Sequence, residues 1–124
     1  MKHIVVLVGL LFAMLGTIVT SPAQPIAGGY AKASVTEKEV QDAAAYAIEA
    51  QAKTMHGQKD GRSTKLELVK ILAAEEQVVA GMNYRLKLQV KVNGKGKLAN
   101  AVVWWQAWRE PDPYQLTSWE WADQ

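Results

Sequence analysis

An alternating pattern of side chains over residues 84–92 constrains this chain more than any other feature. Apolar residues occupy every second position, and Arg85, Lys87, Gln89 and Lys91 fill the positions between them. A period of two is typical of a β-strand with one buried face. A second strand-like run covers residues 65–73. The two runs together predict a β-hairpin whose tip lies at residues 77–81.

The predicted tip is apolar, whereas most hairpin tips are polar. It consists of Gln77, Val78, Val79, Ala80 and Gly81. Exposed valines at a turn are unfavourable in water, and a glycine beside them permits a tight turn or the close approach of another backbone. Burial of Val79 in its own sheet is the alternative. We favour exposure because the core alternation begins only at Tyr84, so the tip is suited to insertion into a partner.

The remaining pattern predicts an α+β fold. Thr36 can cap a helix, an apolar stripe at three- and four-residue spacing continues to residue 51, and glycines at 57 and 61 end the helix. Residues 24–34 are rich in Pro, Gly and Ala, which predicts an extended, loosely held arm. Further strands are expected at 77–92, 98–108 and 114–121. One helix followed by strands implies an antiparallel sheet wrapped on that helix.

These residues resemble the cystatin family, the protein inhibitors of papain-like cysteine proteases. Residues 77–81 fit the family motif QxVxG, Gly28 and Gly29 match its N-terminal glycine, and Ala107 with Trp108 occupies the place of its Pro-Trp pair. The helical stretch 46–49 is similar to the Phe-Ala-Val-acidic stretch of plant cystatins. The chain has no cysteine, so it is most similar to the disulfide-free plant-type or bacterial members.

The resemblance implies a cystatin-like fold and a secreted, reversible, tight-binding inhibitor that occludes the protease cleft. It assigns protease contact to the glycine arm, to the QVVAG hairpin and to a second hairpin, that is, to Gly28, Gly29, Gln77, Val78, Val79, Ala80, Gly81, Ala107 and Trp108. Alanine at position 107 replaces the family proline, and the following loop is longer than usual, so we expect a looser or displaced second hairpin. The alternative function is a cystatin-fold interaction module with little or no protease inhibition.

The tryptophans near the second hairpin are assigned by strand parity. If one strand continues through residue 108, Trp104 and Trp108 share a face and Trp105 points to the other. Trp105 facing the helix is one assignment, but neither face of this strand is clearly polar, so the pattern leaves both assignments open. Trp119 resembles the late aromatic of the family's final strand, and the resemblance implies that it lies in the core.

The N-terminus has the pattern of a signal peptide. A basic start at residues 1–3 precedes an uncharged apolar run over residues 4–19, and Ser21, Pro22 and Ala23 supply a cleavage site. A membrane anchor is the alternative, but the run is short for a span of about 20 residues. We therefore expect a signal peptide at 1–23 and a cystatin-like domain at 24–124. The product would be a secreted or periplasmic monomer with no membrane attachment after cleavage.

Several other functions are disfavoured by composition. The chain has no cysteine, and His56 is the only histidine after residue 23, so neither a Cys-His pair nor a usual zinc site can form. No glycine-rich phosphate loop follows a strand. The net charge is only +2. The basic residues alternate with apolar ones along the predicted strands, which is typical of a sheet face exposed to solvent and not of a nucleic-acid-binding surface. We expect no enzyme activity, no cofactor, no metal and no nucleic-acid partner.

Overall fold

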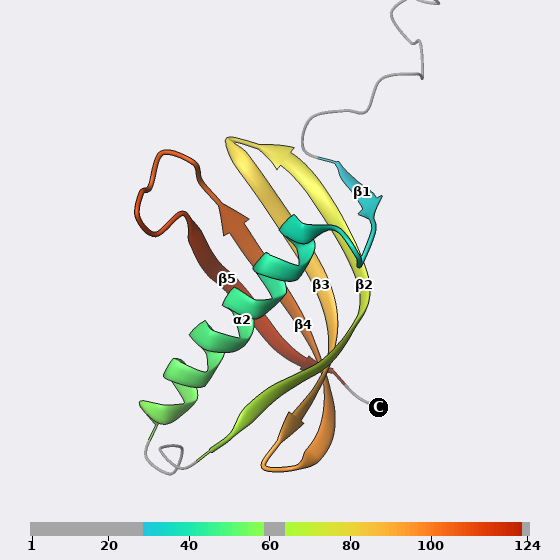
Figure 1. Cartoon of the computed structure of the whole chain (residues 1–124), viewed down its shortest axis with the longest axis vertical. Coiled ribbons are helices and arrows are strands. Elements are labelled where there is room, and N and C mark those ends of the chain that lie inside the picture. Colours follow the sequence, from blue (N-terminus) through green and yellow to red (C-terminus); the bar gives the residue numbers. More distant parts are fainter. Residues whose placement is uncertain (1–28, 59–63, 123–124) are drawn as a thin grey trace, which may run out of the picture.

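The computed structural model describes residues 29–58 and 64–122, which form a five-stranded antiparallel sheet and one α-helix (Figure 1). The elements are β1 (Tyr30–Ala33), α2 (Lys38–His56), β2 (Leu66–Val79), β3 (Gly81–Val92), β4 (Lys95–Trp105) and β5 (Tyr114–Ala122). The strand order in the sheet is β1-β2-β3-β4-β5, so strands that are consecutive in the chain are paired. The expected α+β architecture, an antiparallel sheet packed on one long helix, is confirmed.

The helix lies across one face of the sheet and buries a stripe of small side chains (Figure 1). This stripe consists of Val40, Ala43, Ala44 and Ala47, all fully buried. On the sheet side, Leu86, Leu88 and Val90 of β3 are at most 1% exposed. Alanine on the helix lets its axis approach the sheet closely, since interaxial distance depends on the side chains at the contact. The core is therefore the layer between α2 and the central strands.

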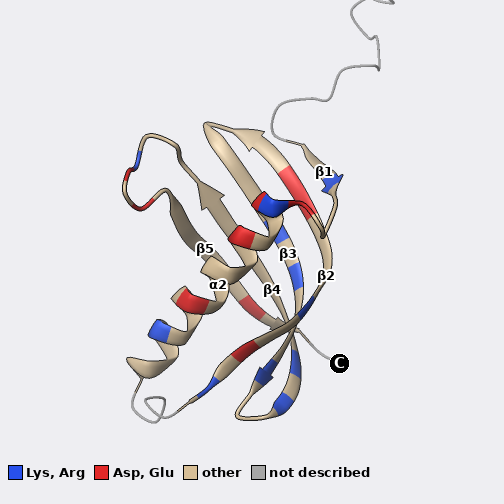
Figure 2. Ribbon diagram, viewed as in Figure 1, with Lys and Arg blue, Asp and Glu red and all other residues tan. Residues whose placement is uncertain are grey.

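The alternation in β3 places its charged residues on the face away from α2. Even-numbered positions from Tyr84 to Val90 are buried, while Arg85, Lys87 and Lys91 are exposed. Figure 2 shows these cations as a row along the strand. The period-two prediction for this strand is confirmed.

The helix begins differently from the prediction. Its N-cap is Glu37, not Thr36, and the Glu37 side chain makes no capping hydrogen bond. The hydroxyl of Thr36 is instead hydrogen-bonded to the Ser34 hydroxyl at 2.7 Å, and the Thr36 N–H donates to the same oxygen at 3.2 Å. The Thr36 side chain is therefore used in the turn before the helix.

The predicted loose arm is partly wrong. Residues 30–33 form β1, which pairs with β2 from Tyr30 opposite Gln77 to Ala33 opposite Ala74. The reason is that β2 is longer than the predicted strand 65–73 and offers a free edge for pairing. Residues 24–28 of the predicted arm, with residues 1–23, 59–63 and 123–124, lie outside the described residues.

Strand β4 also differs from its predicted bounds of 98–108. Asn93 and Gly94 both have positive φ, 51° and 83°, which suits a two-residue hairpin turn and lets β4 resume at once at Lys95. At its other end β4 stops at Trp105, because Gln106 donates its N–H to the carbonyl of Pro113 and the chain then turns.

Tyr84 gives the fold a testable dependence on pH. Burial, with a smaller contribution from the carboxylate of Glu76, raises the pKa of Tyr84 to about 12. The unfolded chain, with a tyrosine pKa of about 10, releases this proton first as the pH rises. The contribution to stability is therefore complete below about pH 10 and is lost between there and about pH 12. In denaturant unfolding, Tyr84→Phe should show a shallower fall in stability over this window than the wild type. Equal slopes would contradict the assignment.

Candidate functional site

Three chain segments meet at one end of the sheet. The chain enters β1 beside the hairpin, since Tyr30 is opposite Gln77. The β2–β3 turn lies at Ala80, and the β4–β5 loop begins after Trp105, which is opposite Met82 near that turn. Figure 1 shows the start of β1, the β2–β3 turn and the β4–β5 loop at the same end of the molecule. We term Gly29, residues 77–81 and residues 107–108 the loop edge; the predicted contact Gly28 lies outside the described residues.

The hairpin tip is narrower than the predicted pentapeptide. Strand β2 continues to Val79 and β3 starts at Gly81, so only Ala80 lies between them. Gln77 belongs to the stem, where its side-chain oxygen accepts a 2.8 Å hydrogen bond from the Asn83 amide. The Val78 side chain is 61% exposed and Ala80 is exposed, whereas Val79 is half-buried. The expected exposure is therefore confirmed for Val78 and Ala80, whereas for Val79 the prediction is wrong, because β2 extends to this residue and holds it in the sheet.

Gly81 lies at a position where a side chain would not fit. Its φ is +83°, a conformation that L-residues other than glycine seldom adopt. A Cβ added there would lie 2.0 Å from the carbonyl oxygen of Trp105 and 3.2 Å from the indole nitrogen of Trp104. The hairpin tip therefore packs backbone to backbone against the end of β4.

The Trp104 side chain contacts both loops of the edge. Its indole N–H donates a 2.7 Å hydrogen bond to the carbonyl of Ala80 at the hairpin tip. Its ring packs edge-on against Trp108 in the other loop, with centroids 6.3 Å apart and planes at 75°. The sequence reasoning did not include Trp104 among the contact residues. The signal available was the parity of Trp104 within β4, which places it on the face away from α2.

The second loop is closed by hydrogen bonds around Gln106. This residue is 3% exposed, and its backbone carbonyl accepts a 3.0 Å bond from the Arg109 N–H, which closes a turn over residues 106–109. The Gln106 side-chain nitrogen donates to the Gln115 side-chain oxygen at 3.5 Å, and Arg109 donates to the same oxygen at 3.0 Å. The sequence reasoning missed Gln106, although a lone polar residue within an apolar and aromatic run was a visible signal.

Ala107 and Trp108 occupy the two central positions of that turn. Both are exposed, and the Trp108 side chain is 60% exposed. The prediction that Trp108 continues the strand is wrong, because β4 ends at Trp105. Trp104 and Trp108 still meet, but through the turn and not through strand parity. Trp119 packs against the core, as expected, and so does Trp105, whose face the sequence pattern left open.

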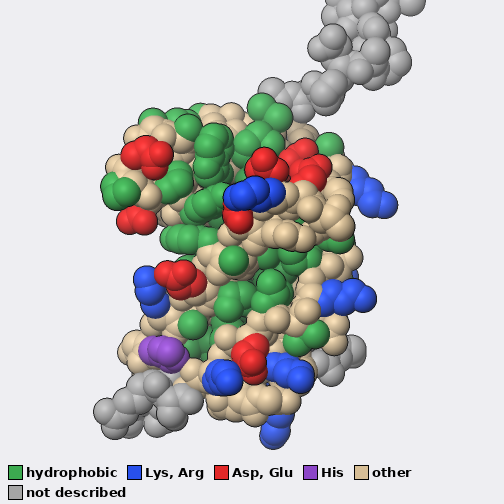
Figure 3. Space-filling model, in the orientation of Figure 1, with side chains coloured by type: hydrophobic (Ala, Val, Ile, Leu, Met, Phe, Trp, Pro, Cys, Tyr) green, Lys and Arg blue, Asp and Glu red, His purple; other side chains and the backbone are tan. Residues whose placement is uncertain are grey.

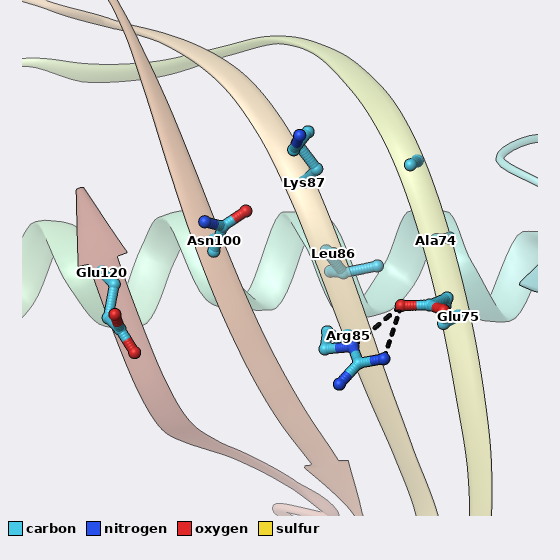
Figure 4. A pocket seen from close by; sticks show the side chains of 8 residues that line it. Ala74, Glu75, Arg85, Leu86, Lys87, Asn100 and Glu120 are labelled. Carbon is cyan, nitrogen blue, oxygen red and sulfur yellow. Dashed lines mark hydrogen bonds and ion pairs between the residues drawn. The ribbon is translucent and has the colours of Figure 1, made fainter. Parts of the chain in front are cut away.

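The start of β1 is held on the sheet by Arg85. Its guanidinium lies 3.8 Å from the centroid of the Tyr30 ring and makes 2.8 Å contacts with a carboxylate oxygen of Glu75 through two of its nitrogens. Figure 4 shows Arg85 and Glu75 directed toward one another at a pocket on the sheet face away from α2. Since Gly29 directly precedes Tyr30, the pairing of Tyr30 with Gln77 brings the exposed Gly29 to the level of the hairpin tip.

The surface of the loop edge is apolar at its tip and charged beside it. Residues 78–81 carry no charge, while Arg109, Glu110 and Asp112 lie in the neighbouring loop. Figure 3 shows hydrophobic side chains gathered over this end of the molecule, with acidic groups beside them. This arrangement suits insertion of an apolar projection into a cleft with a polar rim.

Within 29–58 and 64–122, His, Cys, Asp and Glu side chains form no group of three that could hold a metal ion. Over the described ranges, no helix is both long and apolar enough to cross a bilayer.

Known proteins provide a direct comparison. The family model of aspartic acid proteinase inhibitors (SQAPI) matches residues 33–121. L-cystatin of Tachypleus tridentatus is 31% identical over a 121-residue alignment that covers 79% of this chain and 85% of that protein. The chain belongs to the cystatin family of proteinase inhibitors. The resemblance first seen in residues 77–81 is thereby confirmed at the level of the family.

One further relative of this cystatin and one solved structure of similar fold are informative. Cysteine proteinase inhibitor 7 of Arabidopsis thaliana is 39% identical over 71 residues, which is 57% of this chain but only 28% of that protein. The crystal structure of mialostatin, a gut cystatin from the hard tick Ixodes ricinus, has a TM-score of 0.60 at 18% identity, over 77% of this chain and 99% of that chain. The relatives are named as inhibitors or cystatins, so this cystatin is a protein of an inhibitor family and not an enzyme.

Gly81 and Gly94 provide a matched test of the close backbone approach. Both have φ of +83°, but an added Cβ at Gly94 has nothing within 4 Å. We expect Gly94→Ala to cost about 1 kcal/mol, from backbone conformation alone. Gly81→Ala should cost at least about 1 kcal/mol more, because the new Cβ collides with the Trp105 carbonyl. Denaturant unfolding measures both, and equal losses would contradict the packing of the tip against β4.

Proposed function

We propose that this protein is exported and reversibly inhibits papain-like cysteine proteases by filling their active-site cleft with the loop edge. The observation that supports this most strongly is that Gly29, the hairpin tip and Trp108 lie at one end of the sheet, with Val78 and Trp108 exposed. The name of the Arabidopsis relative, a cysteine proteinase inhibitor, supports the choice of protease class.

In this proposal the three segments divide the cleft between them. The arm with Gly28 and Gly29 lies on the non-primed side, residues 77–81 lie over the catalytic region, and Ala107 with Trp108 lies on the primed side. No peptide bond is offered to the nucleophile in a cleavable geometry, so no covalent intermediate forms. The affinity comes from a preorganised apolar edge, which loses little conformational entropy on docking.

Export depends on the N-terminal segment. We propose that residues 1–23 are a signal peptide and that residues 24–124 form the inhibitor, released outside the cell or into a periplasm as a monomer. The intact mass of protein expressed with its own leader and recovered after export should correspond to a chain that begins at Gln24. A mass that includes residues 1–23 would contradict cleavage.

Inhibition of an aspartic protease is a second candidate, favoured by the match of residues 33–121 to the aspartic acid proteinase inhibitor model. Titration of papain and of pepsin with the exported protein distinguishes the two targets. The proposal expects papain to be inhibited, with reversal on dilution and with binding retained when the papain thiol is blocked by a small group. Serine and metalloproteases should be spared. Inhibition of pepsin alone would replace the proposal with the second candidate, and inhibition of neither would leave an interaction module.

Two exposed valines of β2 offer a matched test of the tip. Val78 is 61% exposed at the tip, and Val69 is 47% exposed roughly 30 Å further along the strand. Val78→Asp should raise the inhibition constant for papain about thirty-fold, as expected when a central contact worth about 2 kcal/mol is disrupted. Val69→Asp should leave inhibition unchanged. The inhibition constants of both variants for papain measure these effects. An equal change in the two variants would mean that the hairpin tip does not contact the protease.

The turn over residues 106–109 predicts the effect of restoring the family's proline. Ala107 is the second residue of this turn, the position at which proline is favoured in the common turn types. Ala107→Pro should therefore raise the free energy of unfolding by about 0.5–1 kcal/mol by restricting the unfolded chain. Inhibition of papain should stay equal or become tighter. Thermal unfolding and inhibition kinetics measure both effects. A loss of stability with weaker inhibition would show that residue 107 requires a conformation closed to proline.

A further inference from the structure

We propose that Trp104 is a positioning residue that holds the two loops of the edge together as one rigid unit. The inference rests on the proposed function, since the unit it describes is the protease-binding edge. Trp104 would act on binding through the loops, without itself entering the cleft. One hydrogen bond, one ring contact and one glycine place Trp104 between the two loops.

The hydrogen bond ties Trp104 to the first loop. Trp104 lies opposite Asn83 in the ladder, on the sheet face away from α2. From there its indole N–H reaches the carbonyl of Ala80, at 2.7 Å, at the single position between β2 and β3. A turn carbonyl has no ladder partner of its own, so this donor restrains the one part of the hairpin that strand pairing does not.

The ring contact ties the same side chain to the second loop. Trp108 packs edge-on against Trp104 at a centroid distance of 6.3 Å, a favoured geometry for aromatic pairs. Because Trp108 is 60% exposed, this contact restrains the indole while leaving most of its surface accessible. Trp104 thus supplies a restraint that the family's proline would give through the backbone.

Gly81 makes room for this arrangement. An added Cβ at Gly81 would lie 3.2 Å from the Trp104 indole nitrogen, which is tighter than an ordinary contact. The adjoining hollow of about 390 Å³, on the face away from α2, is lined by Trp104 with Val79, Ala80, Asn83, Val102 and Thr117. The Trp104 indole therefore lies against the hairpin tip and lines this hollow.

The test uses the exported protein with one substitution and a matched control. Trp104→Phe keeps a ring but removes the N–H donor. Trp121→Phe makes the same change at a tryptophan that also has an edge-on partner, Trp119, but lies opposite Ala99, toward the other end of the sheet. We expect Trp104→Phe to weaken papain inhibition about three- to tenfold, the range for loss of one hydrogen bond. Trp121→Phe should leave inhibition unchanged.

Amide hydrogen exchange of the free protein separates positioning from general destabilisation. In the Trp104→Phe variant, exchange should accelerate at residues 80–82 and 107–109, while the core amides of Leu86 and Leu88 stay as slow as in the wild type. The effects of Trp104→Phe and Trp108→Ala on inhibition should also be non-additive, whereas those of Trp121→Phe and Trp108→Ala should add.

Three outcomes would overturn the inference. Unchanged exchange at both loops would mean that Trp104 does not restrain them. Equal acceleration in the core would mean that its role is structural. Weaker inhibition with unchanged exchange would mean that Trp104 contacts the protease directly. If the wild type does not inhibit papain, the proposed function fails, but the exchange measurement still tests whether Trp104 holds the two loops.

Discussion

The burial of one face of β3 beneath α2 is the constraint on which the rest of the structure depends. Leu86, Leu88 and Val90 are almost completely buried there, and each such side chain contributes about 1.5–3 kcal/mol. Because side chains alternate along a strand, a slip of one residue would place Arg85 under the helix. The register is therefore fixed, and with it the placement of Gly81 against the carbonyl of Trp105. The geometry of the loop edge follows from packing that lies several residues away from it.

The two ends of β2 differ in whether another strand covers the edge and in how regularly they pair with β3. Near the tip, β1 covers its edge over residues 74–77. Further along, two irregularities in the pairing with β3 leave Val69 and Leu72 as extra, exposed residues. Bulges of this kind twist an edge strand and discourage pairing with another chain. The strand thus has a covered end that supports the tip and an irregular end that resists uncontrolled association.

The loop edge was only partly predictable from the sequence. The apolar tip and the exposed Trp108 follow from local patterns, and the family motif orders them along the chain. Strand parity marks Trp104 and polarity marks Gln106 in the sequence, but their partners could not be predicted, because those partners lie in other segments that only strand pairing brings close. The carbonyl of Ala80 that accepts from Trp104 is 24 residues away. The Gln106 contacts with Pro113 and Gln115 exist only once β4 and β5 have paired.

The sequence by itself determined the fold class, the buried face of β3, the helix and the family of this protein, because these depend on periodicity and on short motifs. The tertiary structure alone decided where strands end, that residues 30–33 join the sheet, and which tryptophan holds which loop. These features depend on contacts between segments far apart in the chain, where pairing and packing compete with local preference. The requirement for glycine at position 81 is an example, because it arises from the Trp105 carbonyl on the neighbouring strand as well as from the turn itself.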